Sequence, residues 1–259
     1  MRSILRDLGL AGIAFLASHA AASAAELRVL TVGSTQFAAK AIAEEFSKRT
    51  GHHVTFTVTA PFLIEKELAG KAFDVVIVSV PQMEALERSG QLGAGSRLPI
   101  SRVGVGVVVR EGAPAPDIST VESFKRTMLA ARSITYSDPA VPNLSGAVAV
   151  QALSKAGILE EIKPKARIAM LGPGAELIIK GEAELGFFNL SEVLPGLRVI
   201  GPIPAPLQGY TFYEAALLAR STLPAETASF IKFMASGDSD EKWRAAALEP
   251  AAAYQRAPK

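Results

Sequence analysis

Runs typical of strands alternate with runs typical of helices through the first third of the chain. The strand-like runs are Leu27–Val32, Val54–Thr59 and Val75–Ser79, and the helix-like runs are Gln36–Thr50, Leu63–Gly70 and Pro81–Ser89. This order predicts a parallel sheet flanked by helices. In the first helix, the apolar residues Phe37, Ala38, Ala41, Ile42 and Phe46 share one face, so we expect both phenylalanines in the core rather than at a ligand.

A second alternating set follows the strand-like run Val103–Val109. Its helices are Val121–Arg132, Ala147–Ala156 and Gly174–Lys180, and its strands are Ser133–Tyr136, Arg167–Leu171 and Glu184–Asn189. The chain continues through the strand-like runs Leu197–Ile203 and Thr211–Leu218 and ends in the helices Pro224–Ser236 and Asp240–Ala247. Because these two helices have no sheet of their own, we expect them to pack on the first half.

The pattern predicts an α/β fold with two lobes, each a mostly parallel sheet flanked by helices. We expect residues 25–104 and 210–259 in lobe 1 and residues 105–209 in lobe 2. Crossovers near Val103–Arg110 and Pro204–Leu218 would form a hinge over a cleft.

The N-terminus has the three-part layout of a secretory signal peptide. Arg2 and Arg6 precede the apolar stretch Leu8–Ala17, and small residues follow up to Ala22-Ser23-Ala24. We predict residues 1–24 as the signal peptide and a mature protein exported to the periplasm. The chain contains no cysteine, which excludes disulfides, a thiolate nucleophile and an N-terminal lipid anchor.

The mature chain is nearly neutral. Without Arg2, Arg6 and Asp7, 25 basic residues (27 − 2) face 24 acidic residues (25 − 1). This balance argues against nucleic acid as a partner, and we interpret the basic run Lys163–Arg167 as a solvated loop. We expect a monomer with no cofactor and no metal. His52 and His53 lie in a turn before a strand, where successive side chains face opposite ways.

A small polar turn, Gly33-Ser34-Thr35, separates the first strand from the first helix. A helix N-terminus presents unpaired N–H groups and attracts negative charge, so the turn is a candidate anion site. A similar arrangement recurs at Ser145-Gly146, after the turn-rich loop Asp138–Leu144, and Gly172-Pro173-Gly174 begins another helix. Each turn is equally compatible with an ordinary helix cap.

Ligands in open α/β sheets bind beyond the carboxyl ends of the strands. Thr59-Ala60-Pro61 and Asn189 are predicted to lie there together with Ser34.

The chain resembles the periplasmic type II solute-binding proteins of ABC importers, in particular the molybdate-binding branch. The residues that carry this resemblance are Val32–Thr35, Leu68–Ile77, Ser137-Asp138-Pro139 with Ser145-Gly146, and Glu182–Phe187. The resemblance implies a family oxyanion site in which Ser34 and Ser145 match two of the donors. Pro61 and Asn189 stand where the family has a donor-rich turn and a tyrosine, so we expect molybdate not to be the tightest ligand.

A sub-branch that includes a periplasmic aconitate isomerase is also similar. The likeness lies in Val109–Ser119, Leu185–Glu192 and Val199–Pro204. It implies, as an alternative function, interconversion of cis- and trans-aconitate, which needs a base near a carbon-bound proton. Glu192 and Asp138 are candidate bases, although each is also suited to capping a turn or helix, and Tyr136, Tyr210, Tyr213 and Arg110 are candidates to line the cleft or pack at the hinge.

We therefore expect a protein that captures a small anion between two lobes and delivers it to the membrane permease of an ABC importer. The predicted ligand-binding residues are Ser34, Thr35, Thr59, Ala60, Ser145, Gly146, Gly172, Asn189 and Tyr213.

Overall fold

The computed structural model describes residues 24–141 and 145–255. The predicted signal peptide, residues 1–24, lies outside the described residues except at Ala24, and so do residues 142–144 of the predicted turn-rich loop. Within the described part of the chain, no helix has the length and apolar character needed to cross a membrane.

One sheet runs through the molecule, in the order β2-β1-β3-β9-β4-β7-β5-β6, with β8 and β10 also paired to β4. Its strands are β1 Glu26–Val32, β2 His53–Thr59, β3 Val75–Ser79, β4 Leu98–Arg110, β5 Ile134–Tyr136, β6 Ala166–Ile168, β7 Leu185–Asn189, β8 Leu197–Pro202, β9 Tyr210–Leu217 and β10 Glu249–Pro250. Pairing is parallel among β1, β2 and β3 and among β5, β6 and β7, and it is antiparallel wherever β4 or β9 takes part.

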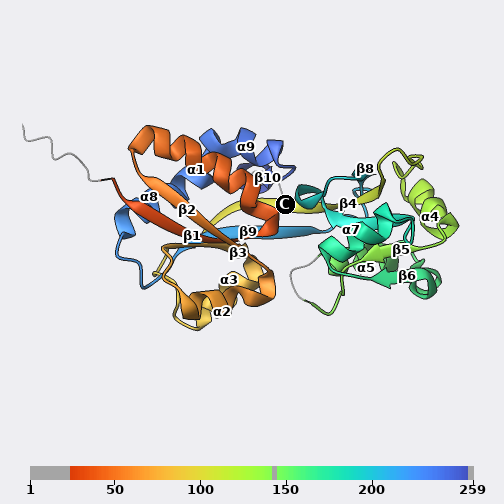
Figure 1. Cartoon of the computed structure of the whole chain (residues 1–259), viewed down its shortest axis with the longest axis horizontal. Coiled ribbons are helices and arrows are strands. Elements are labelled where there is room, and N and C mark those ends of the chain that lie inside the picture. The colour runs from red at the N-terminus through yellow and green to blue at the C-terminus, as the bar shows by residue number, and fades with distance from the viewer. Residues whose placement is uncertain (1–23, 142–144, 256–259) are drawn as a thin grey trace, which may run out of the picture.

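Helices cover both faces of the sheet at each end of the molecule (Figure 1). The helices are α1 Gln36–Thr50, α2 Ile64–Gly70, α3 Val80–Arg88, α4 Val121–Ala130, α5 Ser145–Lys155, α6 Leu159–Ile162, α7 Leu171–Ile179, α8 Pro224–Ala235, α9 Asp240–Ala245 and α10 Ala251–Gln255. In Figure 1, α1, α8 and α9 lie on one side of β1, β2 and β3, and α2 and α3 lie on the other.

The C-terminal helices α8 and α9 pack on the first part of the chain, as predicted. Phe230 of α8 lies 5.0 Å from Phe46 of α1 between ring centroids, and Trp243 of α9 is fully buried in the same core. The Trp243 indole donates to the carbonyl of Met234 at 2.9 Å, so burying this ring leaves its N–H satisfied.

The prediction that Phe37 and Ala41 lie in the core is wrong. Phe37 is 64% exposed and Ala41 is exposed, while the buried face of α1 is formed by Ala38, Ala39, Ile42, Ala43 and Phe46. The apolar stripe is rotated from the predicted one, because the face that packs against α8 through Phe46 carries Ala39 and Ala43 rather than Phe37 and Ala41. Phe37 therefore faces solvent one helical turn from Ser34.

A second core forms around the other end of the sheet, and its strands alternate between two faces. Val105 and Val107 of β4 and Phe187 of β7 pack with α4, α5 and α6, whereas Val108 and Phe188 pack with α7. This alternation places apolar side chains on both faces, as expected for a sheet covered by helices on each side.

Strand β4 belongs to both cores. Val103 packs in the first core and Val105 in the second, so the strand passes from one to the other at Gly104. At this point the side-chain amide of Gln208 accepts from the Val105 N–H at 3.1 Å and donates to the Val105 carbonyl at 2.9 Å. Because this long strand is shared, the sheet is continuous and mixed, rather than two mostly parallel sheets as predicted.

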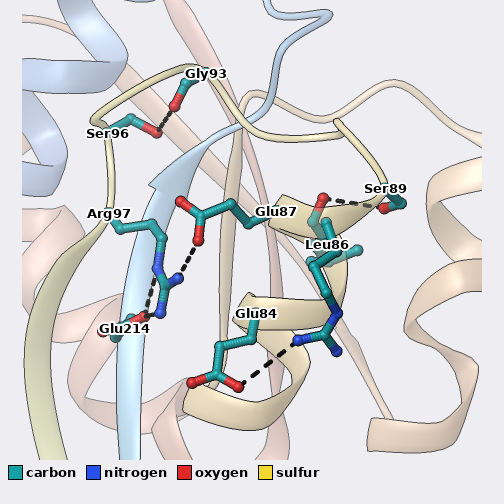
Figure 2. Close-up of polar contacts among 9 residues, drawn as sticks. Glu84, Leu86, Glu87, Ser89, Gly93, Ser96, Arg97 and Glu214 are labelled. Carbon is teal, nitrogen blue, oxygen red and sulfur yellow. Dashed lines mark hydrogen bonds and ion pairs between the residues drawn. The ribbon is translucent and has the colours of Figure 1, made fainter.

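Arg97 fixes β9 against the segment that precedes β4. Figure 2 shows its guanidinium between Glu214 of β9 and Glu87 of α3. The Nε and Nη2 atoms donate to the Glu214 carboxylate at 2.9 and 2.6 Å, and these hydrogen bonds raise the pKa of Arg97. Since Glu214 follows Tyr213 along β9, this ion pair helps to set the position of Tyr213.

Two local predictions are corrected in the second half. The predicted strand Arg167–Leu171 ends at Ile168, because Leu171 already begins α7. Lys165, predicted in a solvated loop, donates from Nζ to the carbonyls of Met128, Leu129 and Ala131 at the end of α4. A cation at a helix C-terminus satisfies carbonyls that lack helical partners.

We expect Phe46→Ala to lower the free energy of unfolding by about 3–5 kcal/mol, because it empties a buried aromatic site. The matched control on the same helix is Phe37→Ala, which should change stability by less than about 0.5 kcal/mol because the ring is exposed. Urea denaturation followed by circular dichroism measures both. Equal losses in the two variants would contradict the assignment of the buried face of α1.

Candidate functional site

The carboxyl ends of strands from both cores meet at one place. Strand β1 ends at Val32 and leads into the short 3-10 turn Gly33–Thr35, while β7 ends at Asn189 and leads into a second such turn, Leu190–Glu192. Across β3 and β9, Ser79 is paired with Tyr213. The topology thus brings Ser34, Asn189 and Tyr213 together from three separate segments of the chain.

The carboxylate of Glu192 occupies the centre of this group. Its Oε2 atom accepts from the Ser34 hydroxyl at 2.7 Å and from Asn189 Nδ2 at 2.7 Å. Asn189 Nδ2 also lies 3.2 Å from Ser34 Oγ, to which it donates. We name Ser34, Asn189, Glu192 and Tyr213 the Ser34 cluster.

Gly33 allows the Glu192 carboxylate to come this close. A Cβ atom at position 33 would lie 2.6 Å from Glu192 Oε1, well inside van der Waals contact. Any other residue at Gly33 would force the end of the Glu192 side chain to move. The glycine in the first turn is therefore explained by a close approach to an acidic side chain.

Tyr213 is fully buried beside this carboxylate. Burial raises the pKa of its phenol, the negative charge of Glu192 raises it further, and a side-chain hydrogen bond with Ser34 opposes the shift. The phenol therefore stays neutral and keeps its proton well above neutral pH.

The cavity at the Ser34 cluster is small, with a volume of about 30 Å³. It has room for roughly one or two water molecules. A larger ligand would therefore need Glu192 to move or the surrounding elements to separate. The residues that line the cavity are Val32, Gly33, Ser34, Pro61, Ser79, Gln82, Glu192 and Tyr213.

The remaining residues predicted near the first turn have other roles or lie at its edge. Thr35 is buried, and its hydroxyl lies 2.7 Å from the Thr31 hydroxyl and donates to the Val32 carbonyl. Thr59 and Ala60 are half-buried at the end of β2, directly before Pro61, whose carbonyl accepts from Gln82 Nε2 at 2.6 Å. Pro61 thus contributes apolar surface to the cavity wall.

The residues predicted around the second turn form a separate network. The Gly146 N–H donates to Ser137 Oγ at 2.8 Å, and the Ser145 hydroxyl donates to the Phe187 carbonyl at 3.3 Å. A Cβ at Gly146 would lie 1.8 Å from the Ser137 carbonyl oxygen, so only glycine fits there. Gly172 is exposed in the first turn of α7.

Glu192 is the residue whose position the sequence predicted least well. It was expected to cap a helix or act as a base, and its carboxylate reaches across to Ser34 from the other core. The other candidate base, Asp138, accepts from the Ala140 N–H at 2.9 Å and caps its own turn. A glutamate three residues after a strand end was the signal in the sequence, but its partner 158 residues away was not visible there.

The other candidate cleft residues lie elsewhere. Tyr136 is buried in the second core, and Tyr210 stacks on Arg102, whose guanidinium carbon lies 3.9 Å from the ring centroid. Arg110 is exposed at the far end of β4. His52 accepts from the Ala25 N–H at 3.2 Å. Among the described residues, no group of three or more His, Cys, Asp or Glu side chains is placed to hold a metal.

A family model described as bacterial extracellular solute-binding protein matches residues 27–247. The chain belongs to this family. Solute-binding proteins of known structure have the same α/β fold. The periplasmic molybdate-binding protein of Azotobacter vinelandii matches with a TM-score of 0.65 and 20% identity, over 86% of this chain and 98% of that chain. Peb3 from Campylobacter jejuni matches with a TM-score of 0.67 and 16% identity, over 86% and 99% of the two chains.

Two relatives share about a third of the residues they align. An aconitate isomerase from Pseudomonas sp is 31% identical over 233 residues, which cover 86% of this chain and 87% of that protein. The molybdate-binding protein ModA of Azotobacter vinelandii is 31% identical over 185 residues, which cover 70% of this chain and 71% of that protein. These findings confirm the resemblance to molybdate-binding solute-binding proteins and to the aconitate isomerase.

Tyr213 should make this solute-binding protein lose stability in alkaline solution. Because its pKa is raised in the folded state, the unfolded chain loses the phenol proton first, so stability falls as the pH rises above the ordinary value of 10.0. Between pH 9 and pH 11, the wild type should lose about 1 kcal/mol more unfolding free energy than Tyr213→Phe.

Urea denaturation at the two pH values measures this difference. Phe37→Ala, which removes no phenol, should retain the wild-type loss. The same loss in wild type and Tyr213→Phe would show that Tyr213 ionises as easily in the folded protein as in the unfolded chain.

Proposed function

We propose that this protein captures a small organic anion between two lobes in the periplasm and hands it to the membrane permease of an ABC importer. The observation that carries the proposal is the Ser34 cluster, in which side chains that follow β1 and β7 converge beside a cavity. A binding protein needs a site shared by two parts that move relative to one another, because ligand then stabilises the closed form.

The two lobes are residues 25–104 with 210–259 and residues 105–209. The passage of β4 from the first core to the second between Val103 and Val105 supports the first boundary. Leu207 in the second core and Tyr213 in the first support the second. Motion about these two strands would open and close the cavity.

We propose that Ser34, Thr35, Thr59, Ala60 and Tyr213 bind the ligand from the first lobe, and that Asn189 at the end of β7 binds it from the second. Ser145, Gly146 and Gly172 would also approach it from the second lobe when the lobes close. Thr35 would contribute a backbone group, because its hydroxyl already pairs with Thr31, and Gly146 would have to release its N–H from Ser137. The protein acts as a monomer and needs no cofactor.

An organic acid is a better candidate than molybdate. Pro61 supplies no N–H, and the Glu192 carboxylate already accepts from Ser34 and Asn189, the donors that a tetrahedral oxyanion would need. A structure of PEB3 holds L-phospholactate, so this fold can accommodate a small organic acid.

Loss of the Ser34 hydroxyl should weaken binding at least about tenfold, because a hydrogen bond to a buried charge contributes roughly 1.5–3 kcal/mol. A thermal-shift screen of oxyanions and di- and tricarboxylates identifies the ligand, and calorimetry on Ser34→Ala gives the affinity. Ser89→Ala is the matched control, since Ser89 is exposed and bonds only within its own turn and to Gln91. Equal affinities in wild type and Ser34→Ala would remove Ser34 from the site.

The position of Glu192 favours a second candidate, an isomerase acting on aconitate like the Pseudomonas relative. The Glu192 carboxylate would take a proton from the methylene carbon, and the double bond would shift as the proton returns to the former vinyl carbon. The neutral Tyr213 phenol could hydrogen-bond to the enolate-like carboxylate that develops between these steps. Atoms and charge balance without a cofactor.

Proton NMR of the purified protein with cis- and trans-aconitate separates the two candidates. As a binding protein, it should interconvert the two isomers only at the rate seen in buffer. Turnover above that rate, abolished in Glu192→Gln and retained in Ser89→Ala, would instead establish the isomerase.

A further inference from the structure

We infer that Glu192 is the residue that determines which anions this site accepts. It excludes oxyanions that have no hydrogen-bond donor, such as sulfate and molybdate, and selects acids that carry a donor next to a carboxylate. The inference rests on the proposed function of binding a small organic anion. Its evidence is the hydrogen bonding of Ser34 and Asn189 around Glu192.

Two donors of the Ser34 cluster, the Ser34 hydroxyl and the Asn189 amide, are already committed to Glu192. A serine hydroxyl has one proton, and that of Ser34 goes to Glu192 Oε2 at 2.7 Å. The Asn189 amide directs Nδ2 to the same carboxylate oxygen and to Ser34 Oγ. A dianion such as molybdate or sulfate would therefore find these donors occupied and a negative charge among them.

Besides the Tyr213 phenol, what the cluster offers to a ligand is acceptors. Asn189 is 4% exposed, and its Oδ1 atom has no hydrogen-bond partner among the described residues. Glu192 Oε1 lies against Gly33, which has no side chain. A buried acceptor without a partner is costly, so a ligand that donates a hydrogen bond there gains affinity.

The ligand chemistry that fits is a carboxylic acid with a hydroxyl or ammonium group on the adjacent carbon. That group would donate to Asn189 Oδ1 or Glu192, and the carboxylate would lie beyond them in the opened cleft. A site that hydrogen-bonds a donor on its ligand discriminates strongly against the analogue that lacks it, because its buried acceptor is then left unpaired.

Four-carbon dicarboxylates test this directly, since malate, aspartate and succinate differ only in a hydroxyl, an ammonium or a hydrogen at one carbon. Calorimetry on the full mature chain should give wild type at least about tenfold tighter binding of malate or aspartate than of succinate. Tighter binding of malate would identify a hydroxyl as the preferred donor, and tighter binding of aspartate would identify an ammonium group.

Glu192→Gln should reduce that preference to less than about threefold and raise the affinity for sulfate or molybdate by about 100-fold, because it removes the charge and keeps the shape. Gly33→Ala displaces the carboxylate without removing it and should also reduce the preference. Glu161→Gln, an exposed glutamate in the second half, is the matched control and should behave as wild type.

Wild-type binding of succinate or sulfate as tight as that of malate and aspartate would overturn the inference. So would a Glu192→Gln variant with unchanged selectivity. In both cases the proposed binding function would stand. Failure of wild type and Glu192→Gln to bind any of these probes would count against the binding function itself as well as the inference.

Discussion

Hydrogen bonding along β4 holds the two cores of this protein in one sheet. The strand spans Leu98–Arg110 and pairs with β9 and β10 at one end and with β7 and β8 at the other. Where it leaves β9, the Gln208 amide takes over its backbone hydrogen bonds at Val105. The ends of β1 and β7 therefore face each other, and the Ser34 cluster exists only because of this arrangement.

The Glu192 carboxylate lies among the side-chain donors of the Ser34 cluster and makes the cluster negatively charged. Glu192 satisfies Ser34 and Asn189 and raises the pKa of Tyr213, so the charge, the donors and the neutral phenol form one network. Family membership alone would suggest an oxyanion site built from neutral donors. A ligand bound at the Ser34 cluster, as we propose, would have to compete with or complement the Glu192 carboxylate.

The sequence predicted most elements to within a few residues, because their periodicity and β-branched runs are local properties. It also placed Ser34 and Asn189 near one another through the rule that strand ends converge, and Tyr213 through its position near a predicted crossover. It failed at Phe37, where two overlapping apolar stripes on α1 could not be ranked without knowing which side meets the sheet. It also failed at the contact between Glu192 and Ser34, since a hydrogen bond between residues 158 positions apart leaves no local pattern.

The most direct measurement is a crystal structure of the mature protein grown with malate. The account predicts malate between the two lobes, with a carboxylate or hydroxyl oxygen within hydrogen-bond distance of Ser34 or Asn189 and its hydroxyl directed at Glu192 or Asn189 Oδ1. Malate bound away from the Ser34 cluster, with the contact between Glu192 and Ser34 intact, would contradict it.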